Sequence, residues 1–560
     1  MQIIKGIPVS GGIGIGEAVV IQPVSQTTTE ITGEDAKNAI INAQKNTIKL
    51  LDEFIAHEPP EVADILKAHK LMVDAIVSEA LEEVEKGHGA VAAINLVIDK
   101  YVKLLTASGS SLIQLRVDDL IDIKNTLLEN LTQKNVEHVK KGSIVVTKEI
   151  QPSQLLRYKN QGIAGIVSER GSYTSHVAII ARNLGIPAVF GAKNATELVK
   201  NGDLIIVDGF LGEVLINPDK NTVELYNAKK KTFTKLIQLF ECAKDKPAIT
   251  TDGHRVFVTA NIGNEDDLNT AMINGCDGVG LFRTEFYYLS RQTLPSSEEF
   301  SRIIEKLASK LEEKPLTIRL LDVGGDKPLP YLSSPKENNP FLGLRGIRYL
   351  LRYRELLKSQ LQAIITASSK QKNIRIMAPM VSTIEEIRLL KEEIEKISPE
   401  AKENIEFGIM VEVPSILFTL DTIIKEIDFL SIGTNDLTQY LFAVDRTNEE
   451  VSYIYDDMHP AVLRAISEIT KHAQKERIPV DVCGELASNP LAVPILIGLG
   501  INELSVSPTS IPIIKWIIQN IPLEGSKRLA KEVLTLENGQ EVREKVREFL
   551  KEYLGEDIPW

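Results

Sequence analysis

From Arg255 onward, short apolar segments alternate with longer amphipathic ones, and this alternation constrains the fold more than any other feature of the chain. Eight segments have the length and composition of buried strands: 255–260, 277–282, 316–321, 374–379, 405–411, 429–433, 479–483 and 503–506. The stretches between them carry apolar residues at helical spacing. Eight strand–helix units in about 300 residues predict a (β/α)8 TIM barrel.

Polar side chains gather at the carboxyl ends of these predicted strands. They are Arg283, Arg319, Glu412, Asn435, Asp436 and Cys483. Active sites of TIM barrels lie on the face where the strands end. This placement supports the barrel prediction and locates a candidate active site.

Two of these residues are carboxylates expected on neighbouring strand ends, Glu412 and Asp436. Carboxylate oxygens suit a hard cation such as Mg²⁺, which keeps waters and substrate oxygens in its remaining positions. Either residue taken alone is better explained as a solvated loop acid. Together they predict a Mg²⁺ site.

Five cationic side chains accompany them: Arg283, Arg319, Arg345, Arg446 and Lys327. So much positive charge in an acidic protein suits a compact anion carrying two or three charges, and a phosphorylated carboxylic acid fits. Any single arginine could instead be a structural ion-pair partner. Cys483, at the end of the seventh strand, is either a packed thiol or a donor that protonates a carbanion or enolate.

A second candidate site is His176, which follows Thr174 and Ser175 at the start of a short predicted helix that closes at Gly185 and Pro187. Free N–H groups at a helix start favour a neutral, nucleophilic imidazole and also favour a bound phosphate. We interpret His176 as a nucleophile that carries a phosphoryl group. The alternative is a buried structural histidine.

The first 250 residues mix strands with a helical region. Glycines between Gly6 and Gly16 precede the apolar run 18–21, which we interpret as a glycine-rich turn entering a strand rather than a nucleotide loop, because no Gly-Lys-Ser/Thr follows. Four helical segments then run from Thr32 to about 131. Strands return at 143–147, 165–168, 203–207 and 213–216.

The early strand lacks an obvious partner in the helical region, so we pair it with the later strands and treat the helices as an inserted bundle. The predicted domains are 1–24 with 141–220 as a discontinuous α/β domain, 25–140 as the bundle, 221–250 as a solvated helical linker, and 251–560 as the barrel. The predicted fold class is therefore multidomain α/β.

Charge and composition argue against several classes of protein. The net charge of −13 disfavours nucleic acid as a partner. Cys242, Cys276 and Cys483 form no C-x-x-C pair, which disfavours a disulfide framework or structural zinc. We expect no transmembrane helix and no secretory signal, and hence a cytoplasmic protein.

Several motifs in this order resemble those of the phosphoenolpyruvate–protein phosphotransferases, called enzyme I of the bacterial sugar phosphotransferase system. The motifs are Thr174-Ser-His-Val-Ala-Ile-Ile-Ala-Arg182, Leu281-Phe-Arg-Thr-Glu285, Asn339-Pro-Phe-Leu-Gly-Leu-Arg345, Gly433-Thr-Asn-Asp-Leu-Thr-Gln-Tyr440, Ala443-Val-Asp-Arg446 and Val482-Cys-Gly-Glu-Leu-Ala487. The resemblance covers nearly the whole chain.

The resemblance implies a swivelling domain with His176 as the phosphohistidine, and a barrel that binds phosphoenolpyruvate. It implies substrate binding by Arg283, Arg319, Asn435 and Arg446, Mg²⁺ ligation by Glu412 and Asp436, and proton donation by Cys483. It also implies that the bundle docks the phosphocarrier HPr and that the barrel forms a homodimer. One departure lies beside the nucleophile, where the chain has Gly171-Ser172-Tyr173 in place of a triplet that usually contains arginine.

Three rival functions remain. A dikinase such as phosphoenolpyruvate synthase shares the phosphohistidine and the barrel, but it needs a nucleotide-binding domain for which the sequence offers neither length nor a phosphate loop. A regulatory phosphorelay protein could use the same fold to sense phosphoenolpyruvate. A barrel lyase or aldolase would use Glu412, Asp436 and Mg²⁺, but it would leave the His176 domain without a role.

Overall fold

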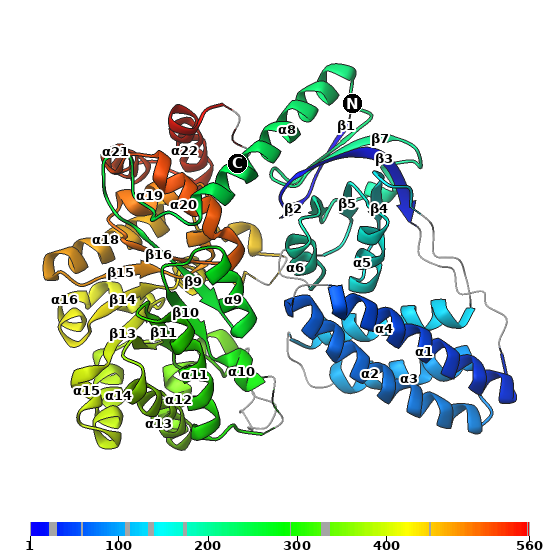
Figure 1. The fold of residues 1–560 in the computed structure, drawn as a ribbon, viewed down its shortest axis with the longest axis horizontal. Helices are drawn as coiled ribbons and strands as arrows, with labels where there is room; N and C mark the ends of the chain where they lie inside the picture. The colour runs from blue at the N-terminus through cyan, green and yellow to red at the C-terminus, as the bar shows by residue number, and fades with distance from the viewer. Residues whose placement is uncertain are drawn as a thin grey trace. The chain divides into compact units, whose positions relative to one another are not determined.

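The computed structural model divides into two compact units, 1–234 and 235–558, within helix α8 (Lys220–Ala243) (Figure 1). The structure describes residues 2–21, 31–57, 60–106, 112–132, 139–171, 176–289, 291, 293–325, 337–446, 448, 450–556 and 558. Each unit has its own hydrophobic clusters.

The second unit is a closed barrel of eight parallel strands, as the alternation predicts. The strands are β9 (Phe257–Ile262), β10 (Val279–Arg283), β11 (Leu316–Arg319), β12 (Ile374–Ala378), β13 (Glu406–Val411), β14 (Phe429–Ile432), β15 (Val480–Val482) and β16 (Glu503–Val506). Each strand pairs with the next along the chain, and β16 pairs with β9 to close the barrel.

Helices connect and surround the barrel strands. They are α9 (Glu265–Ile273), α10 (Glu285–Leu289), α11 (Ser297–Leu311), α12 (Ile347–Arg352), α13 (Arg354–Lys370), α14 (Ile384–Ile397), α15 (Ala401–Asn404), α16 (Leu420–Ile423), α17 (Thr434–Phe442), α18 (Pro460–Glu476), α19 (Val493–Gly498), α20 (Ile511–Asn520), α21 (Leu523–Val533) and α22 (Gly539–Leu554). In α11, Ser296 caps the first turn, and Phe300, Ile304 and Leu307 face the core at helical spacing.

Side chains alternate between the outside and the inside of the barrel along each strand. Val480 and Val482 of β15 belong to the large cluster shared with the surrounding helices. A separate small cluster fills part of the barrel interior and consists of Leu281, Met377, Met410, Phe429 and Cys483. The Cys483 thiol therefore lies on the inner face.

The first unit contains an eight-stranded sheet in the order β1-β8-β7-β3-β4-β5-β6-β2. The strands are β1 (Gln2–Lys5), β2 (Ile7–Ser10), β3 (Ile13–Ile21), β4 (Ile144–Thr147), β5 (Gly165–Ser168), β6 (Ala188–Phe190), β7 (Leu204–Asp208) and β8 (Glu213–Ile216). The early strand β3 pairs in parallel with β4 and antiparallel with β7. This pairing agrees with the predicted insertion of the helices between β3 and β4.

The inserted helices are α1 (Gly33–His57), α2 (Pro60–Glu85), α3 (Ala90–Thr106) and α4 (Leu112–Thr132). Shorter helices accompany the sheet: α5 (Pro152–Asn160), α6 (His176–Asn183) and α7 (Ala195–Leu198). Apolar positions such as Ile40, Ile76 and Ile94 are fully buried where the long helices pack together.

The predicted glycine-rich turn was confirmed only at Gly11 and Gly12, which separate β2 from β3. Its extension to residue 18 was wrong, because β3 already begins at Ile13 and runs through Gly14 and Gly16. Neighbouring backbone explains these glycines. A Cβ on Gly14 would lie 2.5 Å from the Ala164 carbonyl oxygen, and one on Gly16 would lie 2.1 Å from that of Gly142. Glycine is needed here for close approach rather than for turning.

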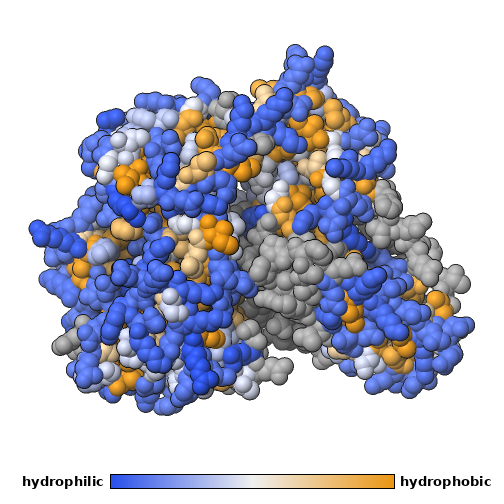
Figure 2. Space-filling view, in the orientation of Figure 1, coloured by the Kyte–Doolittle hydropathy of each residue, from blue (hydrophilic) through white to orange (hydrophobic). Residues whose placement is uncertain are grey.

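Helix α8 is highly charged and has a narrow apolar stripe, as expected for the predicted linker. Leu236 and Phe240 are buried, whereas Leu239 is largely exposed. The face of the molecule seen in Figure 2 is mostly hydrophilic, with apolar residues in small patches. Among the described residues, no helix combines the length and apolarity needed to span a membrane.

Candidate active site

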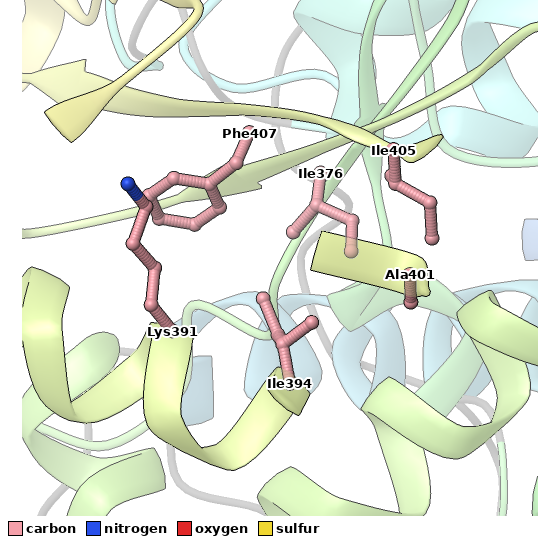
Figure 3. Close-up of a pocket in the computed structure, with 6 residues that line it drawn as sticks. All are labelled: Ile376, Lys391, Ile394, Ala401, Ile405 and Phe407. Atoms are coloured by element: carbon pink, nitrogen blue, oxygen red, sulfur yellow. The ribbon is translucent and has the colours of Figure 1, made fainter. Parts of the chain in front are cut away.

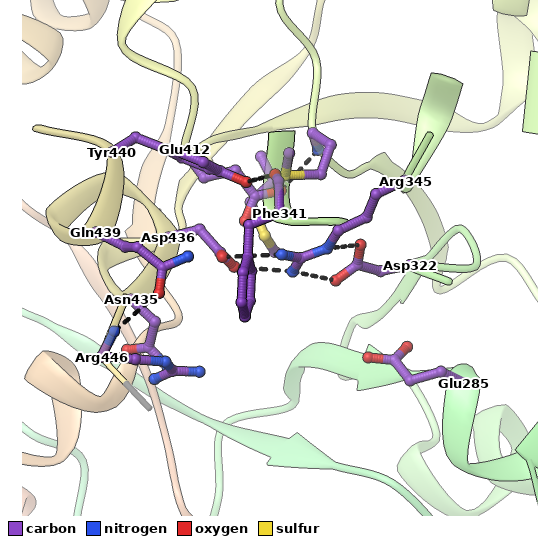
Figure 4. A network of polar contacts seen from close by, with 12 residues as sticks. Glu285, Asp322, Phe341, Arg345, Glu412, Asn435, Asp436, Gln439, Tyr440 and Arg446 are labelled. Atoms are coloured by element: carbon purple, nitrogen blue, oxygen red, sulfur yellow. Dashed lines mark hydrogen bonds and ion pairs between the residues drawn. The ribbon is translucent and has the colours of Figure 1, made fainter. Parts of the chain in front are cut away.

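Arg345 is the centre of a buried ionic network at the carboxyl end of the barrel (Figure 4). Its guanidinium donates from Nε and Nη2 to the two oxygens of Asp322, both at 3.0 Å, and from Nη1 and Nη2 to those of Asp436, both at 3.1 Å. An antiparallel bridge between Gly324 and Arg345 holds the backbone beside Asp322. The side chain of Arg345 is only 2% exposed, so these bonds replace its hydration.

Arg319 ends β11 and is buried beside the same network. Its Nη2 donates to Glu285 and lies 3.4 Å from Asp322 Oδ2. Burial opposes the charge of Arg319, but the adjacent carboxylates outweigh it and raise the pKa of the guanidinium. Its buried Nε makes no hydrogen bond within the described part of the chain, so a donor is left for an anionic group.

Glu412 directly follows β13 and is almost fully buried. Its Oε1 accepts a hydrogen bond of 2.6 Å from the Met380 N–H. Burial raises the pKa of Glu412 well above its usual range, and the negative charges of Asp436 and Asp322 raise it further. A Cβ on Gly433 would lie 2.8 Å from Glu412 Oε2, so a larger residue at this position would displace the carboxylate.

Asn435 and Arg446 converge on Glu485, just after Cys483. The Asn435 amide donates to Glu485 Oε1 at 3.2 Å, and its oxygen accepts from the Glu485 N–H at 2.9 Å. Arg446 Nη1 donates to the same Oε1 at 3.3 Å. These bonds tie the start of α17 to the loop that follows β15.

Cys483 lies inside the barrel with 2% of its surface exposed. Its Sγ is 3.0 Å from Ser431 Oγ and 3.6 Å from the Ile432 carbonyl oxygen. Burial, followed by the charge of Asp481, raises the pKa of Cys483 to about 12. The group is therefore a thiol at neutral pH, as a proton donor must be.

The structure gives less information on the remaining predicted site residues, Arg283, His176 and Lys327. Arg283 ends β10 in register with Arg319 on β11. His176 is the first residue of α6, but its side chain lies outside what the structure describes, as do Ser172–Ser175. Lys327 also lies outside the described residues.

Several residues of the network were missed by the sequence argument. Glu285 and Asp322 neutralise Arg319 and Arg345, so the arginine cluster is less positive than the sequence suggested. Ser431 and Asp481 lie beside Cys483. An available signal was the position of Asp481 within an otherwise apolar strand, because an acid there must be buried.

The carboxylates at this face suit a divalent cation. Glu412 and Asp436 follow adjacent strands, and the negative charge of Asp436 raises the pKa of Glu412. A bound cation would lower this pKa and so favour the ionised carboxylate. Within the described residues, no three or more His, Cys, Asp or Glu side chains are grouped to hold a metal. Two carboxylates completed by water and substrate oxygens are a usual Mg²⁺ arrangement.

A small cavity elsewhere in the unit lacks this chemistry (Figure 3). It lies among β12, β13, α14 and α15 and is lined by Ile376, Lys391, Ile394, Ala401, Ile405 and Phe407. Its lining is apolar except for Lys391, and it includes none of the predicted site residues.

Three family models of PEP-utilising enzymes match successive regions of the chain. Residues 238–523 match the PEP-binding domain of PEP-utilising enzymes, 139–212 match the mobile domain, and 5–116 match the N-terminal domain. A solved structure described as Enzyme I is 31% identical and covers 41% of this chain and 99% of its own, with a TM-score of 0.36.

Curated relatives match over nearly their full length. Phosphoenolpyruvate-protein phosphotransferase of Priestia megaterium is 36% identical, covering 97% of this chain and 98% of the relative. The proteins of the same name from Buchnera aphidicola subsp. Acyrthosiphon pisum and Bacillus subtilis are 37% and 35% identical, each covering 98% of this chain and 100% of the relative. The chain therefore belongs to the phosphoenolpyruvate-protein phosphotransferase family.

Proposed function

We propose that this enzyme transfers the phosphoryl group of phosphoenolpyruvate to its own His176 and then to a histidine of the phosphocarrier HPr, releasing pyruvate. This reaction is the first step of sugar uptake by the phosphotransferase system. The observation that carries the proposal is the buried network of Arg319 and Arg345 with carboxylates, beside a protonated Cys483. Family membership supports the same reaction.

In this proposal the substrate binds where the barrel strands end. The residues that contact it are Arg283, Arg319, Lys327, Arg345, Asn435, Asp436 and Arg446. The buried Nε of Arg319, which has no hydrogen-bond partner among the described residues, donates to an anionic oxygen of the substrate. The guanidinium groups then stabilise charge on the transferring phosphoryl oxygens.

Glu412 and Asp436 would hold Mg²⁺ together with substrate oxygens. When bound, Mg²⁺ neutralises phosphoryl charge and orients the group for in-line transfer. Asp436 also accepts two hydrogen bonds from Arg345, so this carboxylate would position Mg²⁺ as well as the guanidinium.

The chemical step joins His176 to phosphorus while the bond from phosphorus to the enolate oxygen breaks. Cys483 gives its proton to the methylene carbon of the enolate, which becomes the methyl group of pyruvate. Because the pKa of Cys483 is raised to about 12, the thiol holds this proton until the enolate forms.

The roles of the chain segments follow from this reaction. We assign 1–24 and 141–220 to the phosphohistidine domain, 25–140 to HPr docking, 221–250 to the linker, and 251–560 to substrate binding and dimerisation. His176 must reach the barrel to collect the group and leave it to deliver the group, which requires movement of whole domains. A cytoplasmic homodimer stays a prediction from the family resemblance.

The test is to incubate the enzyme with ³²P-labelled phosphoenolpyruvate and Mg²⁺, with and without HPr, and to locate the label. We expect acid-labile label on the enzyme that passes to HPr, and none on His176→Ala. Acid-labile label persisting on His176→Ala would overturn the assignment. Turnover that requires ATP would favour the dikinase, and labelling without transfer to HPr would favour a regulatory role.

Cys483→Ala tests the proton donor separately. We expect a rate of pyruvate formation lowered on the order of a hundredfold, with substrate binding retained, because only the proton transfer is lost. An unchanged rate would remove Cys483 from the mechanism.

A further inference from the structure

A row of polar side chains crosses the inside of the barrel next to Cys483. Ser431 on β14, Asp481 on β15 and Glu503 on β16 are partners in register. The flanking residues Val480 and Val482 pack outward against the helices, so Asp481 faces inward. The inner wall of a barrel is usually filled by apolar side chains, and this polar row departs from that rule.

Ser431 connects the thiol to the acid. Its Oγ is 2.7 Å from Asp481 Oδ2 and 3.0 Å from Cys483 Sγ, and Ser431 is fully buried. A hydroxyl has one hydrogen to donate and two lone pairs that accept. It can therefore accept a proton from Asp481 while it donates its own to the sulfur, or the reverse.

Asp481 is suited to store a proton. It is 7% exposed, and burial raises the pKa of its carboxyl well above the usual range. The charge of Glu503 raises the pKa further, whereas the hydrogen bond from Ser431 and the charge of Arg375 oppose these effects. A neutral carboxylic acid next to a serine hydroxyl can donate to it.

The row reaches water at its far end. The side chain of Glu503 is 20% exposed, and that of Arg375 is 29% exposed. Thr259 donates to Glu503 Oε1 at 2.9 Å, and Arg375 lies 4.0 Å from Glu503 Oε2. The other charged groups near Glu503 are Glu406 and Asp277.

We propose that Ser431 and Asp481 form a proton relay that restores the Cys483 thiol after it has protonated the enolate. This inference rests on the proposed function of Cys483. Because the thiol is 2% exposed, direct return of a proton from bulk water is hindered, and the row supplies a second route. The two residues act through Cys483 and do not touch the substrate.

The relay balances without another reactant. Transfer to the enolate leaves Cys483 as a thiolate. The Ser431 O–H bond breaks as the S–H bond forms, and the Asp481 carboxyl proton moves to Ser431 Oγ. Asp481 is left as a carboxylate, which takes a proton from water at the Glu503 end.

The experiment measures two isotope exchanges in the reverse reaction, in which pyruvate is converted back to phosphoenolpyruvate. The enzyme is incubated with Mg²⁺, unlabelled phosphoenolpyruvate and labelled pyruvate. The pyruvate carries ¹³C in its carboxyl group and deuterium in its methyl group. Entry of ¹³C into phosphoenolpyruvate counts every cycle. Loss of deuterium to water counts only those cycles in which the Cys483 proton exchanges with solvent. For the unaltered enzyme we expect about one deuteron lost for each carbon exchanged, since the relay is fast.

Asp481→Asn and Ser431→Ala should lower this ratio on the order of tenfold, because deuterium then stays on Cys483 and returns to pyruvate. Ser431→Thr, which keeps the hydroxyl, should restore it. Ser505→Ala is the matched control, since it removes another buried barrel hydroxyl that bonds Asn261. A change that only disturbs packing lowers both exchanges together and leaves the ratio constant.

An unchanged ratio in both Asp481→Asn and Ser431→Ala would overturn the relay. Retention of deuterium by the unaltered enzyme would overturn it as well, and this result does not depend on the folding of any variant. Absence of carbon exchange in the unaltered enzyme would instead refute the proposed function itself.

Discussion

Asp322 holds the ionic network together, so its removal tests the structural reasoning most directly. This fully buried carboxylate accepts two hydrogen bonds of 3.0 Å from Arg345 and lies 3.4 Å from Arg319 Nη2. Asp322→Ala leaves two buried guanidinium groups with fewer counter-charges. Removing one partner of a buried ion pair costs about 3–5 kcal/mol.

The lower end of this range applies, because Asp436 and Glu285 still bind the two arginines. We expect the free energy of unfolding of the barrel unit to fall by about 3 kcal/mol. The matched control is Glu305→Ala, which breaks an ion pair of 2.8 Å with Lys370 whose side chains are 22% and 60% exposed. An exposed pair contributes about 1 kcal/mol or less.

Urea unfolding at equilibrium, followed by tryptophan fluorescence, measures the difference. Trp516 is 8% exposed in the barrel unit and packs edge-on against Phe240, with 5.1 Å between the ring centroids. Its fluorescence therefore reports unfolding of the hydrophobic core of the barrel unit. Asp322→Ala should lose about 2 kcal/mol more than Glu305→Ala. Equal losses in the two variants would refute the view that Asp322 neutralises buried cations.

Two further predictions concern the backbone and the pH dependence. Gly16→Ala should destabilise the first unit by about 1–3 kcal/mol, because its Cβ would lie 2.1 Å from the Gly142 carbonyl oxygen; an unchanged melting temperature in calorimetry would contradict this. Burial raises the pKa of Asp252, but hydrogen bonds from Thr250 and the N–H groups of Leu523 and Glu524 outweigh it and lower the pKa to about 2. This depressed pKa stabilises the folded protein above about pH 4, and the stabilisation is lost as the pH falls toward 2. The difference in free energy of unfolding between the unaltered protein and Asp252→Asn should therefore shrink over that range. A constant difference would contradict the prediction.

The barrel and the order of the domains were accessible from the sequence, because they depend on local patterns. Each barrel strand is a short apolar run between helical segments, and a parallel strand buried on both faces needs such a run. The bundle likewise follows from apolar residues at helical spacing. The edge strands β1 and β2 and the inner strand β6 were missed, since segments of three or four residues carry little periodicity.

Contacts between distant segments were decided by the tertiary structure. Gly16 looked like a turn residue, and only its pairing with Ile205 of β7 shows that it lies within a strand. From the sequence, Arg319 and Arg345 could bind an anion or form structural ion pairs, and their pairing with Glu285 and Asp322 depends on where the strand ends meet. A sequence specifies which charges are present but not which of them become neighbours.

In the candidate active site, too, some features could be predicted from the sequence and others depend on the tertiary structure. Residue type and position at strand ends led to the prediction that Glu412, Asp436 and Cys483 belong to one site, and this assignment stays a prediction. The row from Ser431 to Asp481 beside Cys483 was not predictable, because it depends on the register between β14 and β15 in the closed barrel. Local periodicity determines the elements, whereas register and barrel closure determine which side chains lie within hydrogen-bond distance.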